Sequence, residues 1–289
     1  MSQNVNESDK FLTDKICVVT GANAGIGKVT ARELAAQGAT VIMVARSRQR
    51  GEAALADVKT SRGSSKVHLL LAALSSMAEV RQLATDIKAN FNRLDVLVNN
   101  AGAFFKNRQL SPDGFEMTFA LNHLSYFLLT NLLLDRLKAS APSRIVNVSS
   151  GAHFGSQIKF DDLQFEQKYR GFAAYSQSKL ANIMFTYELA RRLEGSKVTA
   201  NVLHPGTVAT QFGAGEGVMS WVYKLLRPFM LTPEQGAETQ VYLASAPQVE
   251  GVTGQYFTKK KPVRSAAASY DTAAAQRLWQ ISAAMVGLD

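Results

Sequence analysis

The amino-acid sequence predicts one α/β domain, built on a doubly wound parallel sheet of about seven strands with helices on both faces. Two observations lead to this fold class. Short apolar runs rich in β-branched residues alternate with helical stretches along nearly the whole chain of 289 residues. The first run, a glycine-rich turn, a helix and a second run also fit within about 30 residues, which is a βαβ unit and requires parallel strands.

The first expected strand, 15–20, ends where Gly21 interrupts the apolar run, and the first expected helix, 28–37, stops before Gly38. The same alternation gives further strands at 40–44, 66–71, 94–98, 144–148, 198–203 and 254–257. It gives further helices at 48–59, 76–90, about 114–137, around Tyr175 and, after a polar loop, near 273–284. No repeat or linker interrupts this pattern, so we expect a tail of residues 1–13 and a single domain of residues 14–289.

The composition argues against several classes of protein. The one cysteine, Cys17, permits no intramolecular disulfide, and the four histidines lack metal-ligand spacing, so we expect no metal site and a reducing, cytoplasmic location. No window of about 18 apolar residues predicts a membrane span. The net charge of +9 fits an anionic cofactor, an acidic membrane surface or a solvated basic surface, and no nucleic-acid-binding motif accompanies it.

The turn after the first strand reads Thr20-Gly21-x-x-x-Gly25-x-Gly27. Glycines permit a tight turn and let backbone N–H groups approach a pyrophosphate at the N-terminus of the following helix. Between a strand and a helix, this pattern predicts a dinucleotide-binding loop rather than a simple turn. The contacts expected in this loop are Gly21, Asn23, Gly25, Ile26 and Gly27.

The end of the second strand indicates which dinucleotide is bound. An NAD site usually carries an acidic residue about 20 residues after the glycines, which binds the ribose 2′-hydroxyl. Here the strand ends in Ala45-Arg46-Ser47-Arg48, and no carboxylate occurs before Glu52. Arg46 can hold a 2′-phosphate by a charge-assisted bidentate contact, with Lys28 or Arg48 adding charge. We therefore expect NADP(H); the alternative is an exposed arginine without a ligand.

Tyr175 and Lys179 lie four residues apart in an expected helix, so their side chains share one face. A phenol ordinarily loses its proton near pH ~10. A lysine ammonium one turn away favours the phenolate and lowers that pKa, which predicts a general acid/base. The alternative is that the two residues are ordinary neighbours on a helix.

These motifs, in this order, resemble the short-chain dehydrogenase/reductase family, a group of Rossmann-like enzymes, and several flanking stretches are similar to its retinol dehydrogenase-like members. The likeness covers nearly the whole chain from Lys15 onward. The motifs are Thr20–Gly27, Asn99-Asn100-Ala101-Gly102, Asn122, Ser149-Ser150, Tyr175-x-x-x-Lys179 and Pro205-Gly206. The similar flanks are 122–138, 143–150, 175–192, 204–206, 232–237 and 278–280.

The resemblance implies catalytic roles for four matching residues. Tyr175 would give or take the carbinol proton, and Lys179 would lower its pKa and bind the nicotinamide ribose. A serine at the end of the fifth strand would hold the substrate oxygen; either Ser149 or Ser150 could serve, and we choose Ser150, the usual one of such a pair. Asn122 would anchor a water that completes a proton path from Lys179.

The resemblance also implies cofactor contacts beyond the glycine loop. They are Arg46, Leu74, Asn99, Ala101, Gly102, Tyr175, Lys179, Pro205, Gly206, Val208 and Thr210. One position departs from the family pattern: Ala73 stands where an Asp usually contacts the adenine amino group. We expect binding to persist through the backbone of Leu74 and the phosphate contacts, though more weakly. The membrane-anchoring N-terminal helix of several animal retinol dehydrogenases is absent, which argues against integral attachment.

Residues 207–235 are expected to form a lid over the substrate, with Gly213, Gly215 and Gly217 as hinges. Its apolar content from Val218 to Met230 predicts a greasy alcohol or carbonyl compound, or else an ordinary helix packed on the core. Basic residues within it could touch an acidic membrane surface. The apolar helices that carry Asn122 and Tyr175 predict a homodimer, as family members often pair such helices.

The sequence therefore predicts an NADP(H)-dependent short-chain oxidoreductase that acts on CH–OH groups and interconverts an apolar aldehyde or ketone and its alcohol. Two alternatives remain open. One is a non-catalytic NADP-binding sensor or scaffold on the same fold, and the other is a reductase of a more polar carbonyl compound. The sensor is disfavoured because Tyr175, Lys179, Ser150 and Asn122 are all present.

Overall fold

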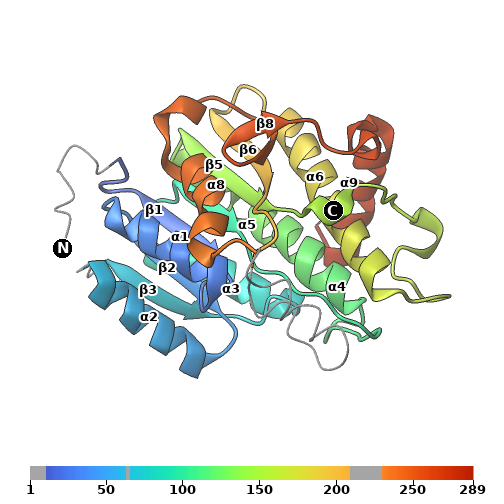
Figure 1. Ribbon diagram of the computed structural model, residues 1–289, viewed down its shortest axis with the longest axis horizontal. Coiled ribbons are helices and arrows are strands. Elements are labelled where there is room, and N and C mark those ends of the chain that lie inside the picture. Colours follow the sequence, from blue (N-terminus) through green and yellow to red (C-terminus); the bar gives the residue numbers. More distant parts are fainter. Residues whose placement is uncertain (1–10, 63–65, 209–229, 289) are drawn as a thin grey trace.

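The computed structural model describes residues 11–62, 66–208 and 230–288. One sheet in the order β3-β2-β1-β4-β5-β6-β7-β8 forms its centre (Figure 1). Every neighbouring pair from β3 to β7 is parallel, and β8 runs antiparallel to β7. The strands are β1 Ile16–Thr20, β2 Thr40–Ala45, β3 Val67–Leu71, β4 Val96–Asn99, β5 Ser143–Val148, β6 Val198–His204, β7 Tyr256–Thr258 and β8 Lys261–Val263. The predicted doubly wound α/β class is confirmed.

The strand count is eight rather than about seven, because part of the expected polar loop after β7 forms a strand. Thr258 pairs with Lys261, so the connection is a two-residue hairpin turn. Its residues Lys259 and Lys260 both have positive φ, 49° and 63°. Such turns normally show Asn or Gly in sequence, and here two lysines adopt the conformation instead.

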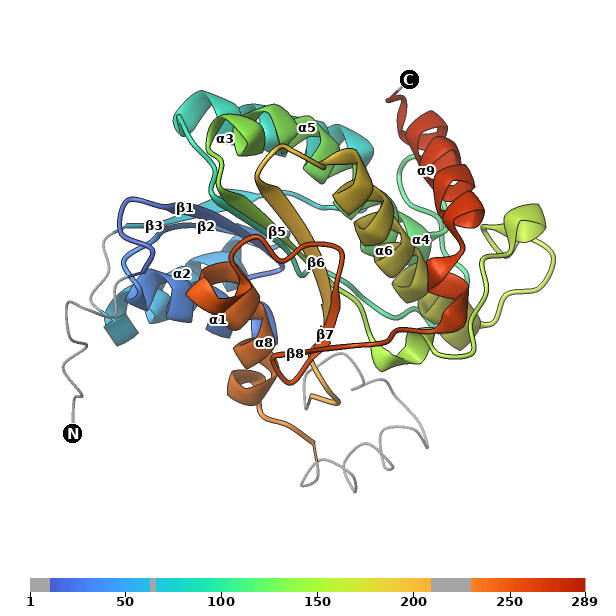
Figure 2. The same ribbon diagram turned by 90° about the horizontal axis from the view of Figure 1, so that it is seen from above.

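Helices cover both faces of the sheet, and each layer encloses its own apolar core (Figure 2). On one face lie α1 Gly25–Ala36, α2 Arg48–Arg62 and α8 Pro233–Ser245. On the other lie α3 Met77–Asn90, α5 Ser125–Ala139, α6 Gly171–Arg192 and α9 Thr272–Val286, with the short α4 Met117–Phe119. The strands between them are buried on both sides, which is why they appear in the sequence as continuous apolar runs.

The predicted helix at about 114–137 contains a π-helical turn, Ala120–Leu124, between α4 and α5. The whole stretch Met117–Ala139 is long and apolar enough to cross a membrane, with a mean hydropathy of 1.2 in its most apolar window. Within the fold, however, 72% of that window is buried, as in a core helix. The sequence expectation had recognised no such window.

The expected tail of residues 1–13 contains a buried residue near its C-terminal end. Leu12 is 5% exposed in the core between β1 and α1, and its N–H donates to Gln37 O at 3.1 Å. The folded domain therefore includes Leu12, because an apolar side chain and a paired backbone N–H anchor it.

The strand order reverses between β1 and β4, so the connections after these two strands leave the same edge of the sheet in opposite directions. In open parallel sheets a crevice forms at this point, outside the carboxyl ends of the strands. Each of the first six strands delivers residues to one cavity there. The residues that directly follow strands β1 to β6 and line this cavity are Gly21, Arg46, Ala72, Asn100, Ser149 and Pro205.

Candidate active site

A cavity of about 880 Å³ lies at the carboxyl edge of the sheet. Most of the residues predicted as site residues line it. These are Gly21, Asn23, Gly25, Ile26, Gly27, Arg46, Leu74, Ala101, Gly102, Ser150, Tyr175, Lys179, Pro205, Gly206 and Val208. Its size falls within the range of small-molecule and cofactor sites.

The glycine turn forms a cradle in which side chains would not fit. Gly21 has φ +67°, and a Cβ there would lie 2.9 Å from the Cα of Ala101. A Cβ at Gly27 would collide with the backbone oxygen of Gly21. The helix α1 that follows begins without a side-chain cap, so the N–H groups of its first turn are available to an anion. The turn therefore fits a dinucleotide pyrophosphate.

Two arginines lie at one end of the cavity, beside the end of β2. Arg46 and Arg50 both line it and are exposed, and within the described residues neither guanidinium is paired with a carboxylate. The predicted helpers of Arg46 lie elsewhere. Lys28 pairs with Asp57 at 2.7 Å, and Arg48 pairs with Glu52 at 3.4 Å. Arg50, four residues after Arg46 and in the first turn of α2, was not predicted, because only residues up to Arg48 were considered as contacts of a 2′-phosphate.

Apolar residues line the cavity next to the end of β3. Ala72 and Leu74 are buried there, and Ser75 lies beside them. Ala73, the position that departs from the family pattern, is outside the lining, and its N–H donates to Glu79 Oε2 at 2.7 Å. The chain therefore offers apolar contact and backbone here rather than a carboxylate.

Three predicted catalytic residues meet at the opposite end of the cavity. Tyr175 and Lys179 project from the first half of α6, and Ser150 follows β5 directly. The Ser150 hydroxyl hydrogen-bonds the Tyr175 phenol. The Lys179 Nζ lies 5.6 Å from the centre of the Tyr175 ring and donates to the main-chain oxygen of Val148 at 3.1 Å. Phe104 packs edge-on against Tyr175, with ring centres 6.1 Å apart.

The electrostatics differ from the sequence expectation. Burial lowers the pKa of Lys179 to about 7. Burial raises the pKa of Tyr175 above its ordinary value of 10.0, and the hydrogen bond with Ser150 partly opposes this. Lys179 does not lower the pKa of Tyr175, because burial also disfavours the charged form of the lysine. A lysine pKa near neutrality lets Lys179 gain and release a proton at working pH.

Asn122 is buried next to the cavity and is not among its described lining residues. Its side chain is fully buried and bonds both backbone groups of Ala103, accepting at 2.8 Å and donating at 3.0 Å. Asn182 Nδ2 donates to the main-chain oxygen of Asn122 at 2.9 Å and lies 3.3 Å from Val148 O, the acceptor of Lys179. Asn122 is thus linked to Lys179 through α6.

Gly102 separates these two groups. A Cβ there would lie 3.2 Å from Asn122 Oδ1 and 3.3 Å from Lys179 Nζ. This contact is tight, so a side chain at position 102 would require Asn122 or Lys179 to shift by a few tenths of an ångström.

The two adjacent serines have different surroundings. Ser149 is 2% exposed, and its hydroxyl donates to the main-chain oxygen of Lys179 at 2.7 Å. Ser150 accepts from the N–H of Ala152 at 3.2 Å and reaches Tyr175. The geometry therefore favours Ser150 as the serine that faces a substrate, and gives Ser149 a supporting hydrogen bond.

Two predicted contacts are not in the lining. Asn99 is fully buried, and its Nδ2 donates to Thr130 Oγ1 and Asn147 Oδ1, both at 2.9 Å. Asn100 lines the cavity instead and donates to Thr20 O at 2.8 Å. Thr210 lies outside the described residues.

Most of the predicted lid also lies outside the described residues, including Gly213, Gly215, Gly217 and the apolar run from Val218 to Phe229. Its two ends are described: Val208 and Leu231 form a parallel bridge, and Met230 lines the cavity. Further lining residues that the sequence did not identify are mostly apolar. They are Phe105, Met117, Leu121, Phe172 and His204.

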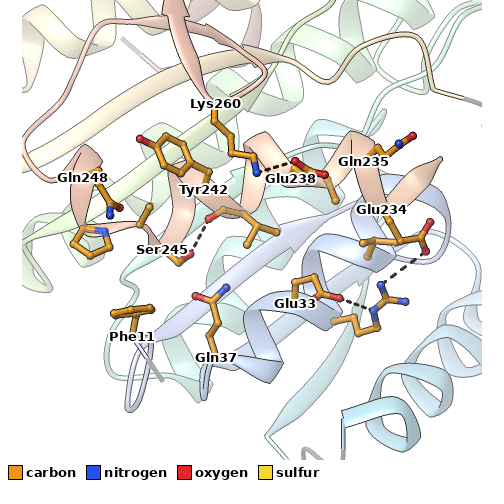
Figure 3. A pocket seen from close by; sticks show the side chains of 16 residues that line it. Phe11, Glu33, Gln37, Glu234, Gln235, Glu238, Tyr242, Ser245, Gln248 and Lys260 are labelled. Carbon is orange, nitrogen blue, oxygen red and sulfur yellow. Dashed lines mark hydrogen bonds and ion pairs between the residues drawn. The ribbon is translucent and has the colours of Figure 1, made fainter. Parts of the chain in front are cut away.

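A second hollow of about 630 Å³ lies between α1 and α8, where Figure 3 shows Gln37, Tyr242 and Lys260 around it. Its charged side chains form salt bridges with one another: Lys260 pairs with Glu238 at 2.7 Å, and Arg32 pairs with Glu33 at 2.8 Å. Its described lining residues do not repeat the arrangement of Tyr175, Lys179 and Ser150. We take the cavity at the sheet edge as the candidate active site because three of the predicted catalytic residues meet there.

The fold and this cavity together define the class: an α/β oxidoreductase that binds a pyridine dinucleotide. The family model described as short chain dehydrogenase matches residues 15–217, and the chain belongs to this family. Within the family it is retinol dehydrogenase-like. It is 47% identical to human (Homo sapiens) retinol dehydrogenase 14 over 291 aligned residues, covering 95% of this chain and 87% of that protein.

Solved structures support the same assignment. An uncharacterized protein from Mycobacterium Paratuberculosis is 35% identical, with a TM-score of 0.77 over 95% of this chain and 94% of that one. An active-site complex of RhlG with NADP from Pseudomonas aeruginosa is 28% identical, with a TM-score of 0.69 over 86% and 96% of the two chains. The chain is thus an oxidoreductase that acts on CH–OH groups and binds NADP(H), as the sequence predicted.

Proposed function

We propose that the protein interconverts an apolar, retinal-like aldehyde or ketone and its alcohol, with preference for NADP(H) over NAD(H). The observation that carries this proposal is the meeting of Tyr175, Ser150 and Lys179 at the end of a cavity whose other end is the glycine cradle. NADP(H), when bound, supplies or accepts the hydride. The protein must then hold the substrate oxygen and move one proton.

In the reductive direction, the Ser150 hydroxyl and the Tyr175 phenol donate hydrogen bonds to the carbonyl oxygen. Tyr175 gives its proton as negative charge develops on that oxygen. Burial keeps the phenol protonated beforehand, which suits an acid. Lys179, with a pKa of about 7, sits beside the phenol and can replace the lost proton. In the oxidative direction the same groups act in reverse.

The preference for NADP(H) is supported by charge at the adenosine end. Arg46 and Arg50 are two guanidinium groups beside the cavity, and among its described lining residues no carboxylate is present to bind a ribose 2′-hydroxyl. A 2′-phosphate would give them a partner, whereas NAD(H) would leave them with solvent alone.

An apolar substrate is supported by the apolar side chains of the cavity that Tyr175 also lines. They include Phe105, Leu121 and Phe172, together with Met117 and Met230. Such a wall favours a hydrocarbon chain or ring over a sugar because polar groups would lose hydrogen bonds to water there. The names of the related retinol dehydrogenases agree with a retinoid-like compound.

The test is oxidation of NADPH and of NADH by the purified protein with retinal, aliphatic aldehydes, steroids and a polar sugar carbonyl. We expect the fastest turnover with NADPH and an apolar aldehyde. Tight NADPH binding without turnover of any carbonyl would favour the sensor or scaffold instead. Faster turnover of the sugar would contradict the apolar assignment.

A further inference from the structure

We propose that His153 is a positioning residue that orients Ser150 through the hydrogen bond from its Nδ1, while the C-terminal segment of the chain helps to hold the ring in place. The proposal rests on the proposed function, since the orientation of Ser150 matters only if its hydroxyl holds the substrate oxygen. His153 closes the short 3₁₀ turn Gly151–His153 that Ser150 caps, and it is fully buried. Its Nδ1 lies 2.6 Å from the main-chain oxygen of Ser150, and its Nε2 lies 3.1 Å from the N–H of Ala266.

These two contacts determine the tautomer. The backbone N–H of Ala266 can only donate, so Nε2 must be the unprotonated acceptor. The proton of the neutral ring is then on Nδ1, from which it is donated to the carbonyl of Ser150. Burial lowers the pKa of His153, which maintains this neutral form. Both ring nitrogens are used, and the ring has one orientation that satisfies both partners.

The Ala266 end of the link is firmly held. The adjacent Ser265 hydroxyl bonds the Tyr187 hydroxyl at 2.7 Å and the Ser269 hydroxyl at 2.7 Å, and its N–H donates to the Tyr270 hydroxyl at 3.1 Å. Tyr187 belongs to α6, the helix that carries Tyr175 about three turns earlier. The anchor of His153 is thus attached to the same helix as the proposed acid.

The Ser150 end leads into the active site. The Ser150 carbonyl accepts from His153 twice, from Nδ1 at 2.6 Å and from the main-chain N–H at 3.2 Å. The side chain of the same serine bonds Tyr175. Two aromatic rings pack against the His153 imidazole. The ring centre of Phe154 lies 4.1 Å from that of His153, and the ring centre of Tyr256 in β7 lies 5.1 Å from it. His204, at the end of β6, is the nearby titratable group on the cavity side.

Two substitutions separate the two halves of the link. His153→Asn places an amide nitrogen where Nδ1 lies, so it keeps a donor to Ser150 and loses the acceptor for Ala266. His153→Gln places its amide oxygen near Nε2, so it keeps the acceptor and loses the donor to Ser150. We expect kcat to fall about tenfold in His153→Gln and less than threefold in His153→Asn, with the NADPH dissociation constant unchanged in both. The exposed His68→Gln is the control.

A double-mutant cycle distinguishes a positioning role of His153 from a purely structural one. In a Ser150→Ala background, His153→Gln should cause no further loss of kcat, because the oriented hydroxyl is already gone. Equal losses of kcat and of melting temperature in both His153 variants, or additive losses in the cycle, would overturn the proposal. Tyr175→Phe separates it from the proposed function. A fully active Tyr175→Phe contradicts the function, whereas an inactive one beside a fully active His153→Gln contradicts only the positioning role.

Discussion

Replacing Lys179 by methionine should stabilise the fold while abolishing turnover. The side chain is 3% exposed, and burial lowers its pKa from 10.5 to about 7. Below pH 7 the folded protein must therefore carry a buried ammonium that the unfolded chain holds in water. The interval from 10.5 to about 7 corresponds to a penalty of about 5 kcal/mol for the charged form. Methionine removes the charge at similar volume and loses one hydrogen bond to Val148, worth about 1 kcal/mol.

The direction with pH follows from the same values. Between about pH 7 and 10.5 the unfolded chain binds the proton that the folded protein lacks, so wild-type stability rises with pH across this window. Below it the penalty is constant. The variant lacks this dependence and should be more stable than wild type by about 4 kcal/mol at pH 6.5, with a gain that disappears toward pH 10.

Urea unfolding followed by circular dichroism at pH 6.5 and at pH 10 measures both predictions. The exposed Lys138→Met serves as control, because its removal leaves the buried charge in place. A Lys179→Met protein that is less stable than wild type at pH 6.5, or that shows an equal gain at both pH values, would refute the assignment of a penalised buried ammonium.

Three further substitutions test other parts of the site. Arg46→Asp should lower the NADPH-to-NADH ratio of kcat/KM by roughly tenfold or more, because a carboxylate repels a 2′-phosphate and accepts a hydrogen bond from a 2′-hydroxyl. An unchanged ratio contradicts the role of Arg46. Gly102→Ala should reduce kcat about tenfold by displacing Lys179, and full activity would show that the tight contact is harmless. Ser149→Ala should cost about 1 kcal/mol of stability in urea with kcat retained, whereas Ser150→Ala should lose about a hundredfold in kcat and remain stable; the reverse result would exchange their roles.

The sequence predicted the sheet because its signal was local. Continuous apolar runs mark strands buried on both faces, and a glycine turn between strand and helix marks the first crossover. Strand β8 was not predicted, because its residues are exposed and Lys259 and Lys260 form its turn at positive φ. No local pattern identifies lysines that will adopt that conformation.

In the site, the sequence identified residues with distinctive spacing and missed those that converge only in space. The four-residue spacing of Tyr175 and Lys179 predicted that they lie one helical turn apart. The burial that lowers the pKa of Lys179, however, depends on packing from several elements. Strand termini were harder to predict: Asn99 points into the core and Asn100 into the cavity, a difference of one residue in an alternating strand. The hydrogen bond between His153 and Ala266 joins residues 113 positions apart, and the link that it completes with Ser150 depends on a tautomer that sequence cannot specify.

The central claim is that Tyr175 is the group that transfers the proton to the substrate oxygen. Single-turnover reduction of an apolar aldehyde by NADPH, compared between wild type and Tyr175→Phe, tests it most directly. We expect the variant to bind NADPH with unchanged affinity and to reduce the aldehyde at least about 10²-fold more slowly, since the hydroxyl that donates the proton has been removed. A variant that reduces the aldehyde at the wild-type rate would contradict it.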